Sequence, residues 1–114
     1  MNGPSWSRQD DPEARRTILV LEGDVVLRLS ASDAIRGAGF RVVEAGNSGE
    51  AFILLKAYPD IAIVVTDLER TGSMNGRAVA EWLGREMPHV KVVLAEAGSP
   101  REIVERIQKL LDGA

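Results

Sequence analysis

Four short segments rich in β-branched and other hydrophobic residues punctuate this chain of 114 residues. They cover residues 17–21, 40–44, 61–67 and 90–95. Apolar runs of this length are typical of parallel strands that helices cover on both faces. The third run is almost uninterrupted, and it ends at the single carboxylate of Asp67 before a polar loop that contains glycine. The pattern predicts four buried strands, with Asp67 at the end of the third.

Hydrophobic residues at helical spacing follow each predicted strand. After the first strand, Leu27, Ala31 and Ile35 recur every four residues, which gives one apolar helix face. Gly37 and Gly39 close this helix, one of them as its C-cap, because glycine accepts the left-handed conformation found there. The pattern predicts a helix that packs on the sheet through this face.

The other three helices are marked by residues that begin or end a helix. Asparagine or serine followed three residues later by glutamate resembles a capping box, and proline ends a helix or occupies its first turn. Asn47 with Glu50 begins one helix, and Pro59 ends it. The next helix follows Gly76 and ends before Pro88, and Ser99 with Pro100 and Glu102 begins the last one.

Strands that alternate with helices over short connections form parallel βαβ units with right-handed crossovers. The sequence therefore predicts an α/β fold, a flavodoxin-like three-layer sandwich whose parallel sheet has the strand order 2-1-3-4. Residues 1–16 are polar and contain two prolines, which predicts a flexible N-terminal arm. Residues 17–114 are predicted to form one domain.

The composition is ordinary for a soluble globular protein, with 45% hydrophobic and 27% charged residues. The formal net charge of -3 gives no reason to expect nucleic-acid binding. No apolar run approaches the length that spans a bilayer, so we expect no membrane partner and a cytoplasmic location. The chain has no cysteine and a single histidine, His89, which argues against thiolate or histidine-cluster metal sites.

Carboxylates stand where the first and third strands are predicted to end. Glu22 and Asp24 follow the first strand, and Asp67 closes the third. In the predicted topology these two ends share one crevice, where α/β proteins keep their chemistry. Clustered carboxylates there suit Mg2+ and the transfer of a phosphoryl group to one of them. The alternative is that such residues only make a turn or, for Asp24, cap the next helix.

Four stretches resemble the receiver domain of bacterial two-component response regulators: ILVLEGD, VVEA, VVTDLERTGSMNGRAVAEWL and REIVERIQKLL. The resemblance implies a single-domain receiver in phosphorelay signal transduction. It implies no enzymatic activity of its own, and a histidine kinase or another signalling protein as partner. It also implies that Asp67 is the phosphoacceptor. Mg2+ would be the cofactor, held by Glu22, Asp67 and the backbone carbonyl of Glu69.

The sequence departs from the receiver pattern at several positions. The second acidic residue that binds Mg2+ in receivers is replaced by Gly23, and Asp24, one position later, is the candidate substitute. The hydroxyl residue that usually ends the fourth strand is Ala95, which cannot donate a hydrogen bond. The loop position usually held by proline is Thr71.

A whole segment of the receiver pattern is missing after Ala95. Receivers continue with a fourth helix, a fifth strand and a Lys-Pro pair, whereas residues 96–99 lead directly to Pro100 and the last helix. Lys91 lies too early and Lys109 too late in the chain to replace the missing lysine. A phosphoryl group on Asp67 would therefore lack most of the cationic and donor groups that its charge needs.

The missing strand leaves the fourth strand as a bare edge, which invites pairing with another chain. We expect a homodimer, formed through this edge, through face packing, or by exchange of the last helix. Two hypotheses for function follow: a receiver that still accepts a phosphoryl group at Asp67, and a pseudo-receiver that binds proteins or dimerises without phosphorylation. The third alternative, a nucleotide-binding or hydrolytic protein, lacks a P-loop pattern.

Overall fold

A computed structural model describes residues 16–67, 76–95 and 99–112 of the chain. Within these ranges strands and helices alternate. The strands are β1 (Thr17–Leu21), β2 (Arg41–Ala45), β3 (Ile61–Thr66) and β4 (Lys91–Leu94). The helices are α1 (Val25–Gly37), α2 (Ser48–Ala57), α3 (Gly76–Glu86) and α4 (Pro100–Asp112).

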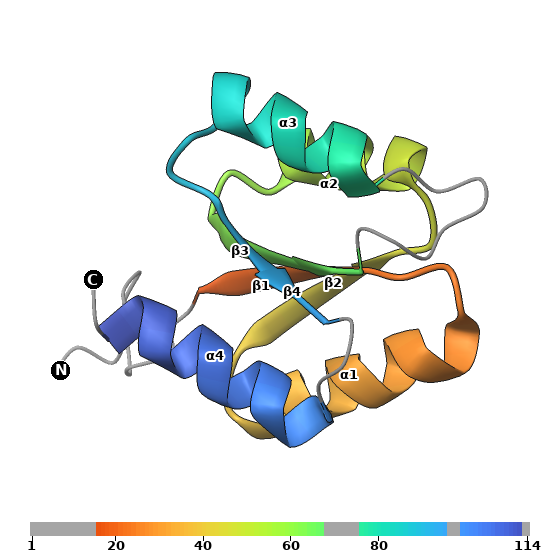
Figure 1. Cartoon of the computed structure of the whole chain (residues 1–114), viewed down its shortest axis with the longest axis vertical. Coiled ribbons are helices and arrows are strands. Elements are labelled where there is room, and N and C mark those ends of the chain that lie inside the picture. The colour runs from red at the N-terminus through yellow and green to blue at the C-terminus, as the bar shows by residue number, and fades with distance from the viewer. Residues whose placement is uncertain (1–15, 68–75, 96–98, 113–114) are drawn as a thin grey trace, which may run out of the picture.

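The sheet has the strand order β2-β1-β3-β4, and every neighbouring pair is parallel. Helices α1 and α4 cover one face and α2 and α3 cover the other, which makes three layers (Figure 1). The predicted flavodoxin-like α/β fold is therefore confirmed. In the part of the chain that the structure describes, no helix is long and apolar enough to cross a membrane.

Side chains of the central strands β1 and β3 alternate between two hydrophobic clusters. The cluster under α2 and α3 includes Leu19, Leu21, Leu55, Val64, Val79 and Leu83. The cluster under α1 and α4 includes Ile18, Val20, Ile35, Ile63, Val65, Ile103 and Ile107. Covering both faces explains why these strands are hydrophobic at consecutive positions rather than at every second one.

Side-chain caps begin α2 and α4 where the sequence predicts them. Asn47 Oδ1 accepts from the Glu50 N–H at 2.9 Å, while Glu50 Oε1 accepts from the Gly46 N–H at 2.7 Å. At α4 the capping box is reciprocal: Ser99 N–H donates to Glu102 Oε1 at 2.9 Å, and Glu102 N–H donates to Ser99 Oγ at 3.2 Å. These bonds lower the pKa of the Glu102 carboxyl, so its contribution to stability is lost as pH falls through that lowered pKa.

The C-terminal end of α1 uses the second of its two candidate glycines. Gly39 has a φ of 99°, and it stands one residue beyond the C-cap Ala38. Its N–H donates to the Arg36 carbonyl at 2.9 Å. The left-handed conformation at this position favours glycine, because a side chain there would be strained.

Strands β2 and β4 differ from the prediction by one residue at each end, and β3 ends at Thr66, one residue before its predicted end. Strand β2 starts after Phe40 and includes Ala45, and β4 starts after Val90 and stops before Ala95. The N–H groups of Phe40 and Val90 donate to carbonyls of the preceding turns, so neither residue joins its strand. Of the predicted arm 1–16, only Arg16 lies within the described residues, and its carbonyl accepts from the β2 residue Arg41 at 3.3 Å.

The first turns of α1 are more exposed than the sequence predicts. Leu27 was expected on the buried face, but it is 42% exposed. In Figure 1 these turns lie beyond the ends of the strands, so the sheet does not cover them. The buried face of α1 is formed further along the helix, by Ala31, Ser32 and Ile35.

Two residues of α4 test how this helix packs on the sheet. Ile107 is 0% exposed, so we expect Ile107→Ala to lower the free energy of unfolding by about 3 kcal/mol, because it leaves a cavity. Leu110 is 39% exposed on the same helix, and Leu110→Ala should cost less than about 1 kcal/mol. Urea denaturation followed by circular dichroism measures both values. Equal losses would contradict the packing of α4 through Ile107.

Candidate functional site at the carboxyl ends of the strands

The sheet register places the last residues of β1, β3 and β4 side by side. Glu22, Asp67 and Ala95 are the residues that follow these three ends. Asp67 is only 4% exposed, so its carboxylate is a buried polar group at the edge where α/β proteins keep their chemistry. The fold thus brings Glu22 and Asp67 to the same edge of the sheet, as the topology predicts.

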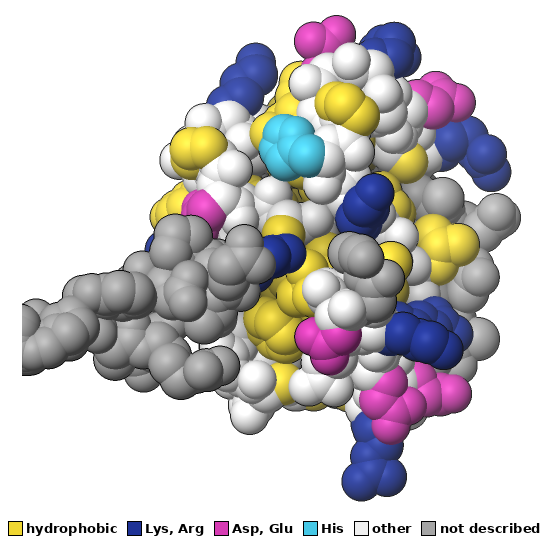
Figure 2. Space-filling model, turned by 90° about the vertical axis from the view of Figure 1, so that its left-hand side faces the viewer, with side chains coloured by type: hydrophobic (Ala, Val, Ile, Leu, Met, Phe, Trp, Pro, Cys, Tyr) yellow, Lys and Arg dark blue, Asp and Glu magenta, His cyan; other side chains and the backbone are white. Residues whose placement is uncertain are grey.

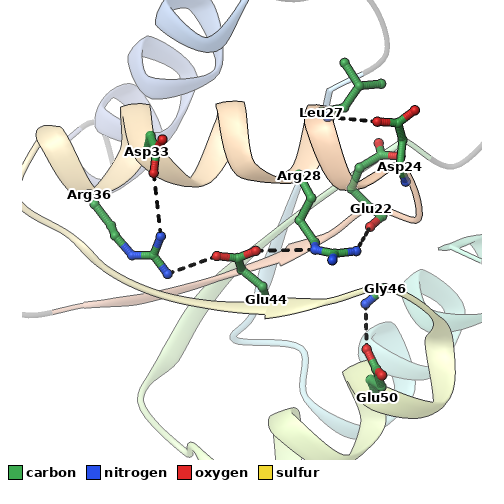
Figure 3. A network of polar contacts seen from close by, with 9 residues as sticks. All are labelled: Glu22, Asp24, Leu27, Arg28, Asp33, Arg36, Glu44, Gly46 and Glu50. Atoms are coloured by element: carbon green, nitrogen blue, oxygen red, sulfur yellow. Dashed lines mark hydrogen bonds and ion pairs between the residues drawn. The ribbon is translucent and has the colours of Figure 1, made fainter.

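Asp24 begins helix α1. Its Oδ1 accepts a hydrogen bond from the Leu27 N–H at 3.0 Å, the usual bond of an N-cap residue. The Glu22 carboxylate accepts from the Asp24 N–H at 2.9 Å. Figure 3 shows both carboxylates at the start of α1. The capping alternative for Asp24 is therefore confirmed, and its role as a metal ligand stays a prediction.

The described residues do not by themselves make up a Mg2+ site. No group of three or more His, Cys, Asp or Glu side chains among them is placed to hold a metal ion. Glu69, the predicted carbonyl ligand, and Thr71 lie outside the described residues. Mg2+ commonly takes one or two protein carboxylates, with water and phosphate oxygens as the other ligands. Glu22 and Asp67 are a partial set of that kind.

Gly23 leaves room for the carboxylate that receivers have at this position. A Cβ built on Gly23 would lie 3.5 Å from the carbonyl oxygen of Gly46, which is an ordinary van der Waals distance. Gly23 has no positive φ, so its backbone conformation suits any residue. The fold therefore does not require glycine here.

A polar network that the sequence did not reveal ties the turn after β1 to β2 (Figure 3). Arg28 on α1 donates from Nη1 to the Glu22 carbonyl at 2.9 Å and from Nε to Glu44 Oε1 at 3.3 Å. Arg36 donates to the second oxygen of Glu44 at 3.0 Å. The Arg28 and Glu44 side chains are 20% and 21% exposed, so water screens this pair less than it screens a surface ion pair. The network holds the turn in place, and the guanidinium of Arg28 is paired with the Glu44 carboxylate.

A cavity of about 100 Å³ lies next to these strand ends, between α1 and α4. Most of its lining is apolar, including Val20, Leu27, Ala31, Val65, Ala95 and Ile103. Glu22 is the one charged residue among the described residues that line it. Neither Lys91 nor Lys109 reaches this cavity, as expected from their positions in the sequence. The described residues of this lining therefore provide no cation for a phosphoryl group.

Substitutions at Asp24 separate helix capping from metal binding. Asp24→Ala removes the acceptor for the Leu27 N–H, and we expect it to lower the free energy of unfolding by about 1 kcal/mol. Asp24→Asn keeps an acceptor, so its stability should stay within about 0.5 kcal/mol of the unchanged protein. Guanidinium denaturation measures both. If Asp24→Asn weakens Mg2+ binding in a titration of tryptophan fluorescence, Asp24 is a ligand after all.

Comparison with known proteins places this fold among response regulators. No family model matches the chain. The transcriptional regulatory protein PdtaR of Mycobacterium tuberculosis, from strain CDC 1551 / Oshkosh and from strain ATCC 25618 / H37Rv, is 28% identical over 108 residues. This alignment covers 93% of the chain and 50% of the relative, so the chain spans half the length of the curated relatives it matches.

Solved structures of response regulators share the arrangement of strands and helices. A CheY-like receiver domain protein from Methanospirillum hungatei JF-1 has a TM-score of 0.70 at 18% identity, over 86% of this chain and 94% of that one. The response regulator DrrB of Thermotoga maritima has a TM-score of 0.72 at 17% identity, over 87% of this chain and 54% of that one. The chain therefore has the fold of response regulator receiver domains, of the CheY-like type.

Proposed function

We propose that the chain acts as a receiver domain in two-component signal transduction, with Asp67 at the phosphoacceptor position. The observation that carries this proposal is the burial of Asp67 directly after the central strand β3, at the edge it shares with Glu22. A histidine kinase or a small phosphodonor would supply the phosphoryl group in the cytoplasm. The chain would receive this group and pass on a signal, rather than act as an enzyme.

The proposed step forms a bond between an Asp67 carboxylate oxygen and phosphorus, while the bond from phosphorus to the donor's leaving atom breaks. The new group brings a charge of about -1.5 to -2 to a buried position. The described residues that line the cavity include the neutral hydroxyl donors of Ser30 and Thr66 but no cation, and Arg28 is engaged by Glu44. We therefore expect phosphorylation to be slow and its effect on the conformation to be small, because few contacts distinguish the two states.

Acetyl phosphate tests the proposal directly. Incubation of the chain with acetyl phosphate and Mg2+ should add one phosphoryl group to a fraction of the molecules, and intact-mass spectrometry measures that fraction. Asp67→Asn should abolish the mass increase, because the acceptor oxygen is gone. A mass increase that persists in Asp67→Asn would show that Asp67 is not the acceptor.

Gly23→Asp is the matched gain-of-function variant for this experiment. A Cβ at this position lies at an ordinary van der Waals distance from Gly46, and aspartate would restore the carboxylate that receivers have there. We expect a faster and larger phosphoryl incorporation and tighter Mg2+ binding, because a second carboxylate increases the charge that attracts the metal ion. If Gly23→Asp changes neither, the missing carboxylate is not what limits the site.

The second candidate function is a pseudo-receiver that binds a protein partner without phosphorylation. Four apolar side chains in the first turns of α1 favour it, since they are between 42% and 74% exposed: Val25, Val26, Leu27 and Leu29. Clustered exposed hydrophobic residues mark contact surfaces. Under this function the partner would bind Asp67→Ala as tightly as the unchanged chain. If partner binding depended on phosphorylation, Asp67→Ala would abolish it.

The expected homodimer, formed through the β4 edge, through face packing or by exchange of α4, stays a prediction. Light scattering of the purified chain at micromolar concentration should give the mass of two copies. The exchange of α4 is a suitable route, because this helix buries Ile103 and Ile107 against the sheet in one copy and would do so equally in another. A mass of one copy at every concentration tested would contradict the dimer.

A further inference from the structure

A groove runs along the open edge of the sheet, between β4 and α4. Its volume is about 320 Å³, and it is lined by Val92, Val93, Leu94, Arg106, Lys109 and Leu110. Figure 2 looks at the side of the molecule where β4 begins and α4 ends. Hydrophobic side chains lie exposed there among those of Lys and Arg. Neither the phosphoacceptor position nor the cavity beside it contributes to this groove.

Every second residue of β4 turns its backbone groups toward the groove. The Ala95 N–H donates to the Thr66 carbonyl at 3.0 Å, so Ala95 faces β3. Backbone direction alternates along a strand, and Val92 and Leu94 therefore face outward. Arg106 Nη1 donates to the Leu94 carbonyl at 2.6 Å from the α4 side, in agreement with this alternation. Among the described residues, no strand pairs with the outward groups of Val92 and Leu94.

The charge beside these backbone groups is positive. Arg106 and Lys109 are the charged residues that line the groove, and the exposed Lys91 begins the same strand. The acidic residue one turn before Arg106 is Glu102, whose carboxylate accepts from the Ser99 N–H and also interacts with the charge of Arg106. This basic edge stands out in a chain with a net charge of -3. Pairing of two copies through β4 would bring like charges together, so the charge favours an acidic occupant over a second copy.

We propose that the groove binds an extended acidic segment of another protein as a fifth strand of the sheet. Side chains of an added strand alternate between the two faces. Those on the α4 face would meet Arg106 and Lys109, so they should be Asp or Glu. Those on the opposite face would lie beside Val92, which packs on the cluster under α2 and α3, so they should be apolar. The segment thus has alternating acidic and apolar residues, and its binding does not depend on phosphorylation of Asp67.

Arg106 would serve two purposes in this mode of binding. Without a partner it satisfies the Leu94 carbonyl, which is otherwise an unpaired acceptor at a sheet edge. When an N–H of the added strand takes over that carbonyl, the guanidinium becomes available to a carboxylate of the same segment. The groove therefore exchanges one internal hydrogen bond for a strand ladder and a charge-assisted bond.

Hydrogen exchange at single amides tests the geometry. The probe is a blocked peptide of three Glu-Val repeats, added to the full-length chain, with three Lys-Val repeats as the matched control. In the free chain the amides of Val92 and Leu94 should exchange rapidly and those of Val93 and Ala95 slowly. The Glu-Val peptide should slow the exchange at Val92 and Leu94, and the Lys-Val peptide should not. Binding that leaves these two amides unprotected, or equal binding of both peptides, would overturn the proposal.

Two variants test backbone pairing and charge separately. Val92→Pro removes an outward N–H without breaking the ladder to β3, as is usual for proline on an edge strand, and should weaken peptide binding about tenfold. Lys109→Glu should also weaken it about tenfold, whereas Lys56→Glu on the far helix α2 should leave it unchanged. Circular dichroism verifies the fold of each variant. Unaltered binding of the Glu-Val peptide by Val92→Pro would contradict the proposal. It would also be contradicted if the unchanged chain formed a dimer, did not bind the peptide, and lost the dimer on Val92→Pro.

Discussion

Burial of the central strands on both faces is the constraint on which the rest of this structure depends. Each residue of β1 is at most 1% exposed. Because its side chains point to both faces, helices must cover each face, and the chain has to cross back over the sheet after every strand. Because of these crossovers, all strands start at one end of the sheet and finish at the opposite end. Asp67 thus acquires its position from packing along the whole chain and not from a local motif.

The short connection after β4 affects both the candidate site and the sheet edge. Residues 95–99 lead from β4 directly into α4, which packs on the sheet through Ile103 and Ile107. A largely apolar cavity lies next to the ends of the strands, and a groove lies along the open edge of β4. Under the proposed function, the same short connection would remove groups from the strand ends and leave the β4 edge open for contact. Under the functions proposed above, this coupling would favour binding over phosphoryl sensing.

The fold could be predicted from the sequence because hydrophobic periodicity reports burial, and burial decides the layers. The strand order follows from the alternation of strands and helices. The helix starts at Asn47 and Ser99 and the left-handed glycine after α1 follow from local capping signals. Leu27 was misplaced because spacing along a helix does not say how far the sheet extends beneath it. The Arg28–Glu44 pair was missed for a related reason, since its two residues are 16 positions apart and meet only once α1 lies across β2.

The candidate site could be predicted less well, because similar residues at neighbouring positions have different structural roles. Asp24 directly follows Gly23 in the chain. Its carboxylate nevertheless accepts from the Leu27 N–H, because Asp24 is the residue that begins α1. Moving it toward the strand ends would leave that N–H without its acceptor, which opposes the motion by about 1 kcal/mol. The backbone at Gly23 has room for an acidic residue in addition to this cap. At this position the lack of a carboxylate therefore reflects a single side chain and is not imposed by the backbone.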